Sequence, residues 1–245
     1  MVRNAIIAFV LGLGLAGAAG AQHEAELDEA NNNIANTASL QRGAKYFVNY
    51  CLGCHSAKYV RYNRLAQDLQ LSEQQLIDNL MFTGERPFDT MANAMQPEDS
   101  ERWFGITPPD LSLIARSRGT DYIYTFLRGF YAAPDRPTGV DNIVLPGTAM
   151  PHVLWELQGT QRAVFATDEE HSGVEVIERF DMARPGELGV EEFDSVVRDI
   201  VNFLDYIGEP IKRERQQLGI RVIGFLLVFL LIAYMLKKEI WKDVK

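Results

Sequence analysis

The residues best suited to chemistry are the two cysteines of the chain, Cys51 and Cys54, which are followed at once by His55. A disulfide across two intervening residues would constrain almost none of the unfolded chain, so a structural bridge explains them poorly. The order C-x-x-C-H is instead the signature of c-type haem attachment. Two thiols can form thioethers with the porphyrin, and the adjacent imidazole can ligate the iron. The spacing therefore predicts a covalently held haem with His55 as an axial ligand.

Two other cysteine chemistries fit the surroundings less well. A thioredoxin-like dithiol follows a strand, whereas the segment TASLQRGAKYFVNYC (37–51) has apolar residues at helical spacing. A structural zinc site needs four ligands, and the chain has no second cysteine pair. Haem attachment remains the leading interpretation. A haem-free domain with an accidental motif is the alternative. The histidines of the chain are His23, His55, His152 and His171.

A second axial ligand must come from elsewhere in the chain. Met150 stands out because LPGTAMPHV (145–153) is loop-like, with small residues before Met150 and Pro151 directly after it. A methionine ligand would give the iron a higher potential than a second histidine. His152 is the rival ligand, two positions away. The methionine candidates are Met81, Met91, Met95, Met150 and Met182.

The amino end has the features of a secretory signal peptide. Arg3 supplies a positive charge, AIIAFVLGLGL an apolar core, and residues 19–21 a small-residue cleavage pattern. We therefore predict that residues 1–21 are removed and that Gln22 begins the mature chain outside the cytoplasm. An uncleaved anchor is the alternative, but the apolar run is short and glycine-rich for a span of about 20 residues.

A second apolar segment lies near the carboxyl end, with no charge between Val222 and Leu236. At about 1.5 Å per residue, the segment 219–236 comes close to the hydrocarbon core of about 30 Å. We predict a transmembrane helix over 219–236, a periplasmic haem domain over 22–218 and a cytoplasmic tail over 237–245. A buried core helix is the alternative. Basic residues are equally frequent on the two sides of the span, so their distribution does not predict its orientation. The signal peptide instead predicts the side of the membrane on which the domain lies.

The exported part of the chain is acidic. Residues 22–236 contain 31 Asp and Glu residues against 19 Lys and Arg residues. This balance disfavours nucleic acid and anionic lipid as partners and favours a basic one. Two acidic clusters are either a docking surface for a basic protein or ordinary solvated surface. The clusters are Asp168, Glu169 and Glu170, and Glu187, Glu191, Glu192 and Asp194.

Hydrophobic spacing predicts a mainly α domain with a small β element. Alternation over 152–159 and 173–182 predicts two paired strands around a charged turn, and Pro210 marks a break before the membrane segment. The segment 84–106 has no clear local pattern, and we expect a surface excursion that flanks the haem. The segments with helical spacing are 37–51, 71–82, 121–131 and 189–208.

Longer stretches extend the pattern around the cysteines. They are CLGCHSAKYVRYNRL (51–65), PPDLSLIARSRGTDYIYTFLRGFY (108–131) and TAMPHVLWELQG (148–159), followed by the single apolar span. Together and in this order they resemble the cytochrome c1 family, the membrane-anchored haem subunits of cytochrome bc1 complexes. The likeness covers most of the mature chain and is far more specific than C-x-x-C-H alone.

The resemblance implies a class I cytochrome c-like haem domain that holds one haem c through Cys51 and Cys54. It implies that His55 is the proximal ligand, that Met150 is the distal ligand, and that Pro109 packs near the haem.

The resemblance also implies that Arg118 and Tyr122 bind a haem propionate, for which a guanidinium is well suited. From its own surroundings, Arg118 would be a solvated cation at a helix end, because Gly119 follows it as a cap.

The function that the resemblance implies is electron transfer within ubiquinol:cytochrome c oxidoreductase, not catalysis by this chain alone. The chain would take electrons from the Rieske iron–sulfur subunit and pass them to a soluble cytochrome c. It would lie beside cytochrome b in a dimeric complex of the cell inner membrane. The alternative in the same class is a membrane-tethered monohaem cytochrome c that serves another redox complex, such as a terminal oxidase.

Overall fold

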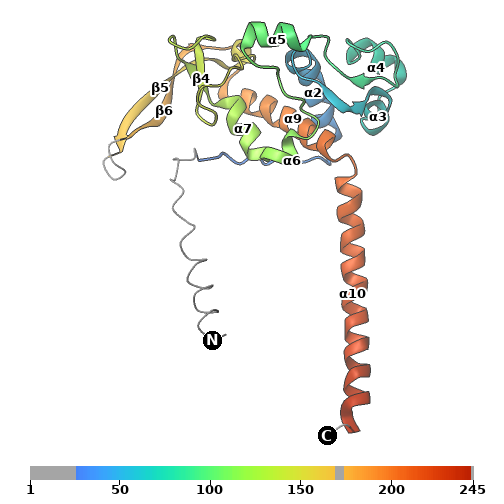
Figure 1. Cartoon of the computed structure of the whole chain (residues 1–245). Coiled ribbons are helices and arrows are strands. Elements are labelled where there is room, and N and C mark those ends of the chain that lie inside the picture. The colour runs from blue at the N-terminus through green and yellow to red at the C-terminus, as the bar shows by residue number, and fades with distance from the viewer. Residues whose placement is uncertain (1–25, 169–173, 244–245) are drawn as a thin grey trace, which may run out of the picture.

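Helix α9 (Val190–Gly208) runs through the middle of a helical domain, and α2, α6, α7 and α8 pack against it (Figure 1). The computed structural model describes residues 26–168 and 174–243. This arrangement confirms the predicted mainly α fold with a small β element. The helices before α9 are α2 (Thr37–Tyr46), α3 (Tyr62–Asp68), α4 (Glu73–Asn79), α5 (Pro97–Phe104), α6 (Ile114–Arg118), α7 (Thr120–Arg128) and α8 (Trp155–Gln158).

Antiparallel strand pairs lie at the edges of the helical core. The first pair brings the segment after the cysteines together with part of 84–106, and the last pair is a long hairpin that projects from the domain (Figure 1). The pairs are β1 (Ala57–Arg61) with β2 (Thr90–Met91), β3 (Phe130–Ala132) with β4 (Val140–Asn142), and β5 (Gly159–Asp168) with β6 (Val174–Pro185).

The structure contains the predicted pair of strands, but the predicted first strand is wrong. Residues 152–159 form a turn and the short helix α8, and the strand that pairs with β6 begins only at Gly159. Gly159 has φ +88°, and a Cβ there would meet the carbonyl oxygen of Arg184 on the facing strand. The apparent alternation of 152–159 instead reflects a turn and one helical turn that bury Leu154 and Leu157 in the core.

The packing of α2 on α9 forms the centre of the core. Hydrophobic side chains of α9 recur every three or four residues, and those facing α2 are buried. The rings of Phe47 and Phe203 pack at a centroid distance of 5.3 Å. At Gly43 the two helices come so close that a Cβ would meet the carbonyl oxygen of Asp199 and lie 2.7 Å from Cβ of Phe203. Glycine is therefore required where α2 crosses α9.

A polar clamp fixes the rotation of α2 against α9. Asp199 is 5 % exposed and accepts hydrogen bonds from Ser39 Oγ at 2.5 Å and from Arg42 Nε at 2.5 Å and Nη2 at 2.9 Å. Asn202 donates to Ser39 Oγ at 2.8 Å. A buried carboxylate is tolerated only when its charge is paired and its oxygens are bonded, as they are here.

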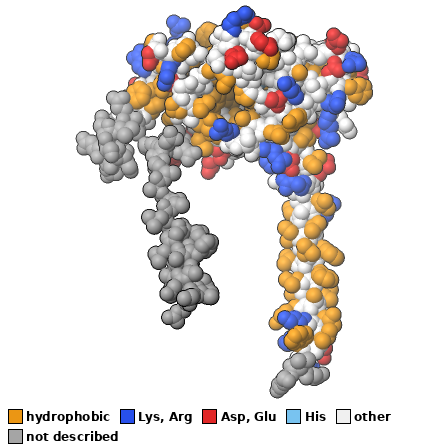
Figure 2. Space-filling model, in the orientation of Figure 1, with side chains coloured by type: hydrophobic (Ala, Val, Ile, Leu, Met, Phe, Trp, Pro, Cys, Tyr) orange, Lys and Arg blue, Asp and Glu red, His pale blue; other side chains and the backbone are white. Residues whose placement is uncertain are grey.

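Helix α10 (Lys212–Ile240) leaves the domain just after Pro210 and contains the predicted span 219–236. Between its charged ends the helix exposes apolar side chains, which cover the face seen in Figure 2, and it is long enough to cross a membrane. A C-terminal membrane anchor is therefore supported. The helix begins earlier and ends later than 219–236, and a 3₁₀ turn, Trp241–Asp243, follows it. The predicted signal peptide, 1–21, lies outside the described residues.

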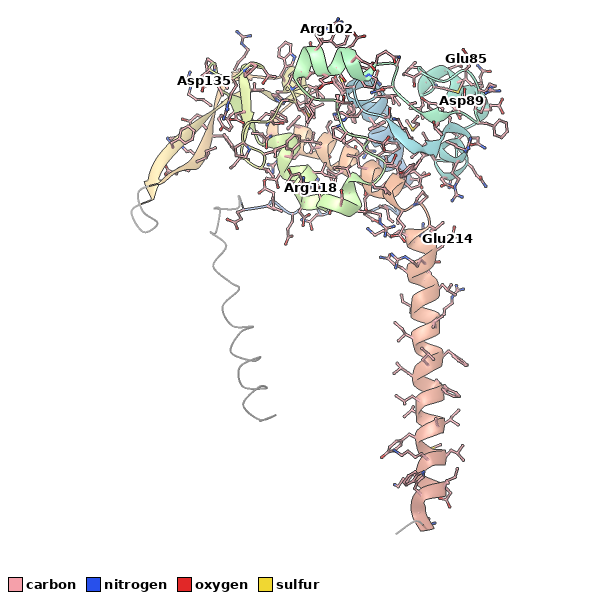
Figure 3. All side chains as sticks on the ribbon, in the orientation of Figure 1. Glu85, Asp89, Arg102, Arg118, Asp135 and Glu214 are labelled. Atoms are coloured by element: carbon pink, nitrogen blue, oxygen red, sulfur yellow. The ribbon has the colours of Figure 1, made fainter. Side chains whose placement is uncertain are left out.

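Two ion pairs join the N-terminal turn of α10 to the C-terminal end of α9. Lys212 Nζ lies 2.8 Å from both carboxylate oxygens of Asp205, and Arg215 Nε lies 2.5 Å from Glu209. Figure 3 shows the exposed Glu214 beside this junction. Because both pairs cross the break at Pro210, they restrain the direction in which the helix leaves the domain.

We predict that Gly43→Ala lowers the free energy of unfolding by about 2 kcal/mol, because the added methyl forces α2 away from α9. Urea unfolding of the purified protein in detergent, followed by near-UV circular dichroism, measures the change. Lys45→Ala, at an exposed position of the same helix, is the control and stays within about 0.5 kcal/mol of wild type. Equal stability of the two variants would contradict the close-packing interpretation.

Candidate haem site

The cysteine motif sits where α2 widens into a π-helical turn, η2 (Phe47–Cys51). The amides of Cys54 and His55 both donate to the Cys51 carbonyl, at 3.0 and 2.8 Å. The chain therefore curls around one carbonyl oxygen, and both thiols and the imidazole belong to a single turn. Short π-helical turns are frequent at functional sites. Both cysteines are free thiols.

The two thiols differ in their surroundings. Cys51 is buried and Cys54 is half-buried. Burial raises the pKa of the Cys51 thiol to about 12, with a smaller contribution from Cys54, and burial also raises the pKa of Cys54. Thiols with raised pKa values are poor at disulfide exchange, which depends on an accessible thiolate. This pair therefore lacks the setting of a redox-active dithiol.

The imidazole of His55 is held by the backbone of a distant loop. Its Nδ1 lies 2.7 Å from the carbonyl oxygen of Pro109, and because a carbonyl can only accept, Nδ1 carries the proton. Nε2 is then the nitrogen with a lone pair for a metal. Burial lowers the pKa of His55, which keeps the ring in its neutral, ligating form. The donors present thus fit a haem iron bound at Nε2.

A hydrogen-bond network fixes the Pro109 loop beside β1. Asp110 accepts from the Lys58 amide at 2.9 Å and from the Ser112 amide at 2.8 Å. The Tyr59 amide donates in turn to Ser112 Oγ at 3.1 Å. Partial burial opposes ionisation of Asp110, but the hydrogen bonds from Ser112 and Lys58 outweigh it and lower the pKa of the carboxyl. The network holds the Pro109 carbonyl where His55 needs it.

The segment 84–106 returns to the cysteine motif. The Asn93 side-chain amide donates to the Cys54 carbonyl, and its backbone amide donates to Ser56 Oγ at 2.9 Å. Met91 is fully buried in β2, as a core side chain. The expectation that this segment flanks the haem motif agrees with these contacts. Asn93, Asp110 and Ser112 had no local sequence signal that marked them in advance.

Arg118 and Tyr122 lie together at the junction of α6 and α7. Arg118 ends α6, is exposed and is followed by Gly119 with φ +89°, as expected for a helix-end cation with a glycine cap (Figure 3). Its guanidinium carbon is also 5.4 Å from the centroid of the Tyr122 ring. One anion could therefore contact both side chains, which suits the predicted role toward a propionate.

The two rival distal ligands have different environments. Met150 lies in the loop between β4 and α8, half-buried against the hydrophobic core. His152 is 8 % exposed, and its ring stacks on Phe130 at a centroid distance of 5.1 Å and an angle of 7°. Burial lowers the pKa of His152 to about 4. His152 is therefore already engaged in an aromatic contact, whereas Met150 is the flexible, polarisable side chain of the loop.

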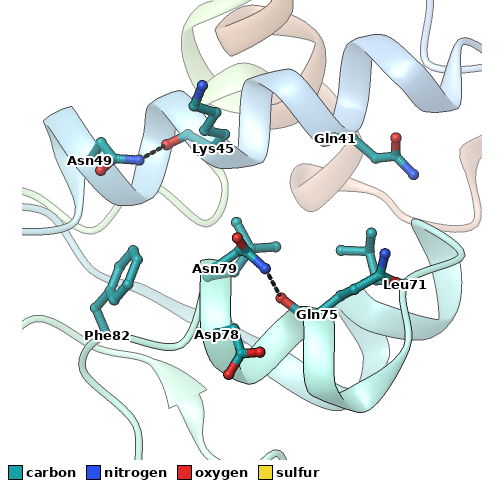
Figure 4. Close-up of a pocket in the computed structure, with 9 residues that line it drawn as sticks. Gln41, Lys45, Asn49, Leu71, Gln75, Asp78, Asn79 and Phe82 are labelled. Atoms are coloured by element: carbon teal, nitrogen blue, oxygen red, sulfur yellow. Dashed lines mark hydrogen bonds between the residues drawn. The ribbon is translucent and has the colours of Figure 1, made fainter.

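A cavity of about 360 Å³ lies between α2 and α4, away from these residues (Figure 4). The amides of Asn49, Asn79 and Gln41 that line it already donate to the carbonyls of Lys45, Gln75 and Leu69. None of the predicted site residues lines it. Its side chains belong to the packing between helices, and we assign it no ligand.

Comparison with known proteins places the chain in a family. The model of the Cytochrome C1 family matches residues 31–162 and 189–244. The chain belongs to the cytochrome c1 family. The unmatched residues between the two ranges comprise most of the β5–β6 hairpin.

Individual relatives agree over nearly the whole chain. Cytochrome c1 of Allochromatium vinosum is 46% identical over 99% of this chain and 100% of its own length. The ammonia monooxygenase gamma subunit of Nitrosomonas europaea is 42% identical over 100% of this chain and 99% of its own length. Cytochrome c1 of Rhodospirillum rubrum is 28% identical over 84% of this chain and 82% of its own length.

Membership of the family confirms the resemblance found in the sequence. It indicates a c-type haem and the electron-transfer role of the haem subunit of a bc1 complex. The alternative, a tethered cytochrome of a terminal oxidase, is not favoured.

We predict that Asp110→Asn lowers the free energy of unfolding at pH 7 by about 1 kcal/mol, since hydrogen bonds to a charged acceptor are weakened. The folded state lowers the pKa of Asp110, so its contribution exists above the unfolded pKa, about 4, and is lost as pH falls through the folded pKa. Urea midpoints from pH 7 to 3 should therefore converge for wild type and variant. Asp78→Asn, at an exposed position of α4, is the control. A difference that persists unchanged at pH 3 would contradict the prediction.

Proposed function

We propose that this member of the cytochrome c1 family carries one haem c, attached through Cys51 and Cys54, and transfers electrons within a cytochrome bc1 complex. The observation that carries the proposal is the His55 imidazole, whose Nδ1 is bound to the Pro109 carbonyl and whose Nε2 remains available within the cysteine turn. The family membership supports the same assignment.

Each site residue has a physical role in this proposal. The bound haem supplies the one-electron couple between ferric and ferrous iron. His55 ligates through Nε2, and its hydrogen bond to Pro109 makes the imidazole a more basic ligand. Met150 would be the second ligand of the iron, and a thioether there would raise the potential. Cys51 is buried and Cys54, His55 and Met150 are half-buried, and this partial shielding from water would favour the reduced, less charged centre.

A haem propionate needs a partner where it enters the protein. The guanidinium carbon of Arg118 lies 5.4 Å from the centroid of the Tyr122 ring. The two side chains can therefore bind one carboxylate, Arg118 by a charge-assisted hydrogen bond and Tyr122 by a hydrogen bond from its hydroxyl. The exposed guanidinium at the end of α6 is free to turn toward the propionate. In this proposal Arg118 stabilises the carboxylate and so helps to set the potential.

The partners follow from the same role. Electrons arrive from the Rieske iron–sulfur subunit, leave to a soluble cytochrome c, and the chain lies beside cytochrome b in a dimeric complex. The proposed location is the cell inner membrane, with one span in α10 and the haem domain on the periplasmic side. The apolar surface of α10 and the acidic balance of the domain support this arrangement.

The acidic cluster at the start of α9 has local structural roles. Glu192 accepts from the Gly189 amide at 3.1 Å as a helix cap, and Asp194 pairs with Arg128 Nε at 2.7 Å. Carboxylates are also favourable at a helix N-terminus. Glu192 and Asp194 are thus engaged within the domain, and docking of a soluble cytochrome c on this cluster stays a prediction. Glu169 and Glu170 of the other cluster lie outside the described residues.

We predict that the protein, exported with haem-maturation machinery, carries one haem that stays attached under denaturing conditions. Replacing both Cys51 and Cys54 by alanine removes the thiols that form the thioethers, so covalent haem is lost completely. A pyridine haemochrome assay and haem staining of a denaturing gel measure this. Covalent haem in the double variant would refute the attachment, and no haem in wild type would refute the proposed function.

We further predict that Met150→Leu abolishes the methionine-to-iron charge-transfer band of the ferric protein and lowers its midpoint potential, because the thioether ligand is lost. Optical redox titration measures both quantities. Met182→Leu is a matched control, since Met182 is 47 % exposed on β6. An unchanged band in the Met150 variant would assign the distal position to another residue, with His152 the first candidate.

A further inference from the structure

A continuous aromatic column joins the two parts of the proposed haem site. Tyr122 and Phe126 stack at 6.3 Å and 6°, Phe126 and Phe130 meet edge to face at 5.1 Å, and Phe130 stacks on His152 at 5.1 Å and 7°. The Arg118 guanidinium lies over the Tyr122 ring, with its central carbon 5.4 Å from the ring centroid. The column (Tyr122, Phe126, Phe130 and His152) thus runs from the proposed propionate pair to the loop that carries Met150.

Three separate elements build the column, and its inner end is fixed. Tyr122 and Phe126 are one helical turn apart on α7, which places them on the same face. Phe130 opens β3, is 1 % exposed, and its carbonyl accepts from Gln161 Nε2 of β5 at 2.8 Å. Because Phe130 is anchored on both its ring and its backbone, it is a rigid surface for the His152 ring.

We propose that His152 is a positioning residue, whose stacking on Phe130 holds the adjacent Met150 where it can ligate the haem iron. This inference rests on the proposed function. The link between the two residues is Pro151 alone, whose ring restricts its φ angle. Two residues span at most about 7 Å, so fixing the His152 ring restricts the position of Met150.

The environment of His152 indicates that the flat ring matters more than its polar atoms. His152 is buried, yet its Nε2 has no hydrogen-bond partner among the described residues. The Gly159 backbone and the Gln158 side chain interact with the imidazole, but Nε2 itself lacks a well-formed hydrogen bond, and an unpaired buried polar atom is costly. Stacked aromatic rings, by contrast, stabilise one another beyond the area they bury. A phenylalanine should therefore preserve the function of His152, and an alanine should not.

The test compares His152→Ala and His152→Phe in the full-length, haem-loaded protein. The ferric methionine-to-iron charge-transfer band and the midpoint potential are measured by optical redox titration. We expect His152→Ala to weaken the band and to lower the potential toward that of Met150→Leu. His152→Phe should keep the band and a potential near wild type. A folded His152→Ala protein with a wild-type band and potential would overturn the inference.

A second variant approaches the same contact from the opposite side. Phe130→Leu removes the surface on which His152 stacks, and it should weaken the band as His152→Ala does. Leu76→Ala is the control for simple loss of stability, because Leu76 is fully buried in α4, at the opposite end of the domain from β4 (Figure 1). It should lower the urea midpoint but leave the band and the potential unchanged. Equal spectral changes in Leu76→Ala would overturn the inference.

The outcomes separate this inference from the proposed function. If His152→Phe loses an axial ligand while Met150→Leu keeps the wild-type spectrum, His152 is itself the ligand and the positioning role is wrong. If the wild-type protein carries no covalent haem, the proposed function fails and the inference fails with it. A wild-type protein with haem and a Met150-dependent band, together with an unaffected His152→Ala variant, overturns the inference alone.

Discussion

The close crossing of α2 over α9 is the constraint on which the rest of the structure depends. The cysteine turn continues directly from α2, so any rotation or shift of α2 moves both thiols and the imidazole of His55. Glycine at position 43 permits the close approach, and the buried Asp199 clamp selects one rotation of the helix. A flexible haem motif thus acquires a defined position because its helix is locked to the longest core helix.

The surroundings of His55 are completed by residues from a second segment. Pro109 contributes its carbonyl to His55, and Asp110 attaches that loop to the strand that follows the cysteines. One short network therefore orients the imidazole, fixes its tautomer and ties three parts of the chain together. On the proposed distal side, the aromatic column joins α7 and β3 to the loop that carries Met150. In the proposed arrangement, a polar network supports His55 and an aromatic column supports the Met150 loop.

The limits of sequence-based prediction are visible in particular elements. Helical spacing was sufficient to predict a helix over 189–208, because one face of this helix is buried along its whole length. The same method failed for 152–159, where the alternation arises from a turn that buries Leu154 and a short helix that buries Leu157 and Gln158. Over so few residues, the period of a strand cannot be distinguished from such a pattern.

The sequence by itself determined the chemistry and the anchoring: the C-x-x-C-H motif, the apolar span near the carboxyl end and the main helices all follow from local spacing. Only the tertiary structure decided which distant groups serve the site. The Pro109 carbonyl, the Asp110 network, the return of Asn93 and the stack of His152 on Phe130 join residues far apart in the chain. Such contacts depend on how helices and loops pack around α9, and local periodicity carries no information about that packing.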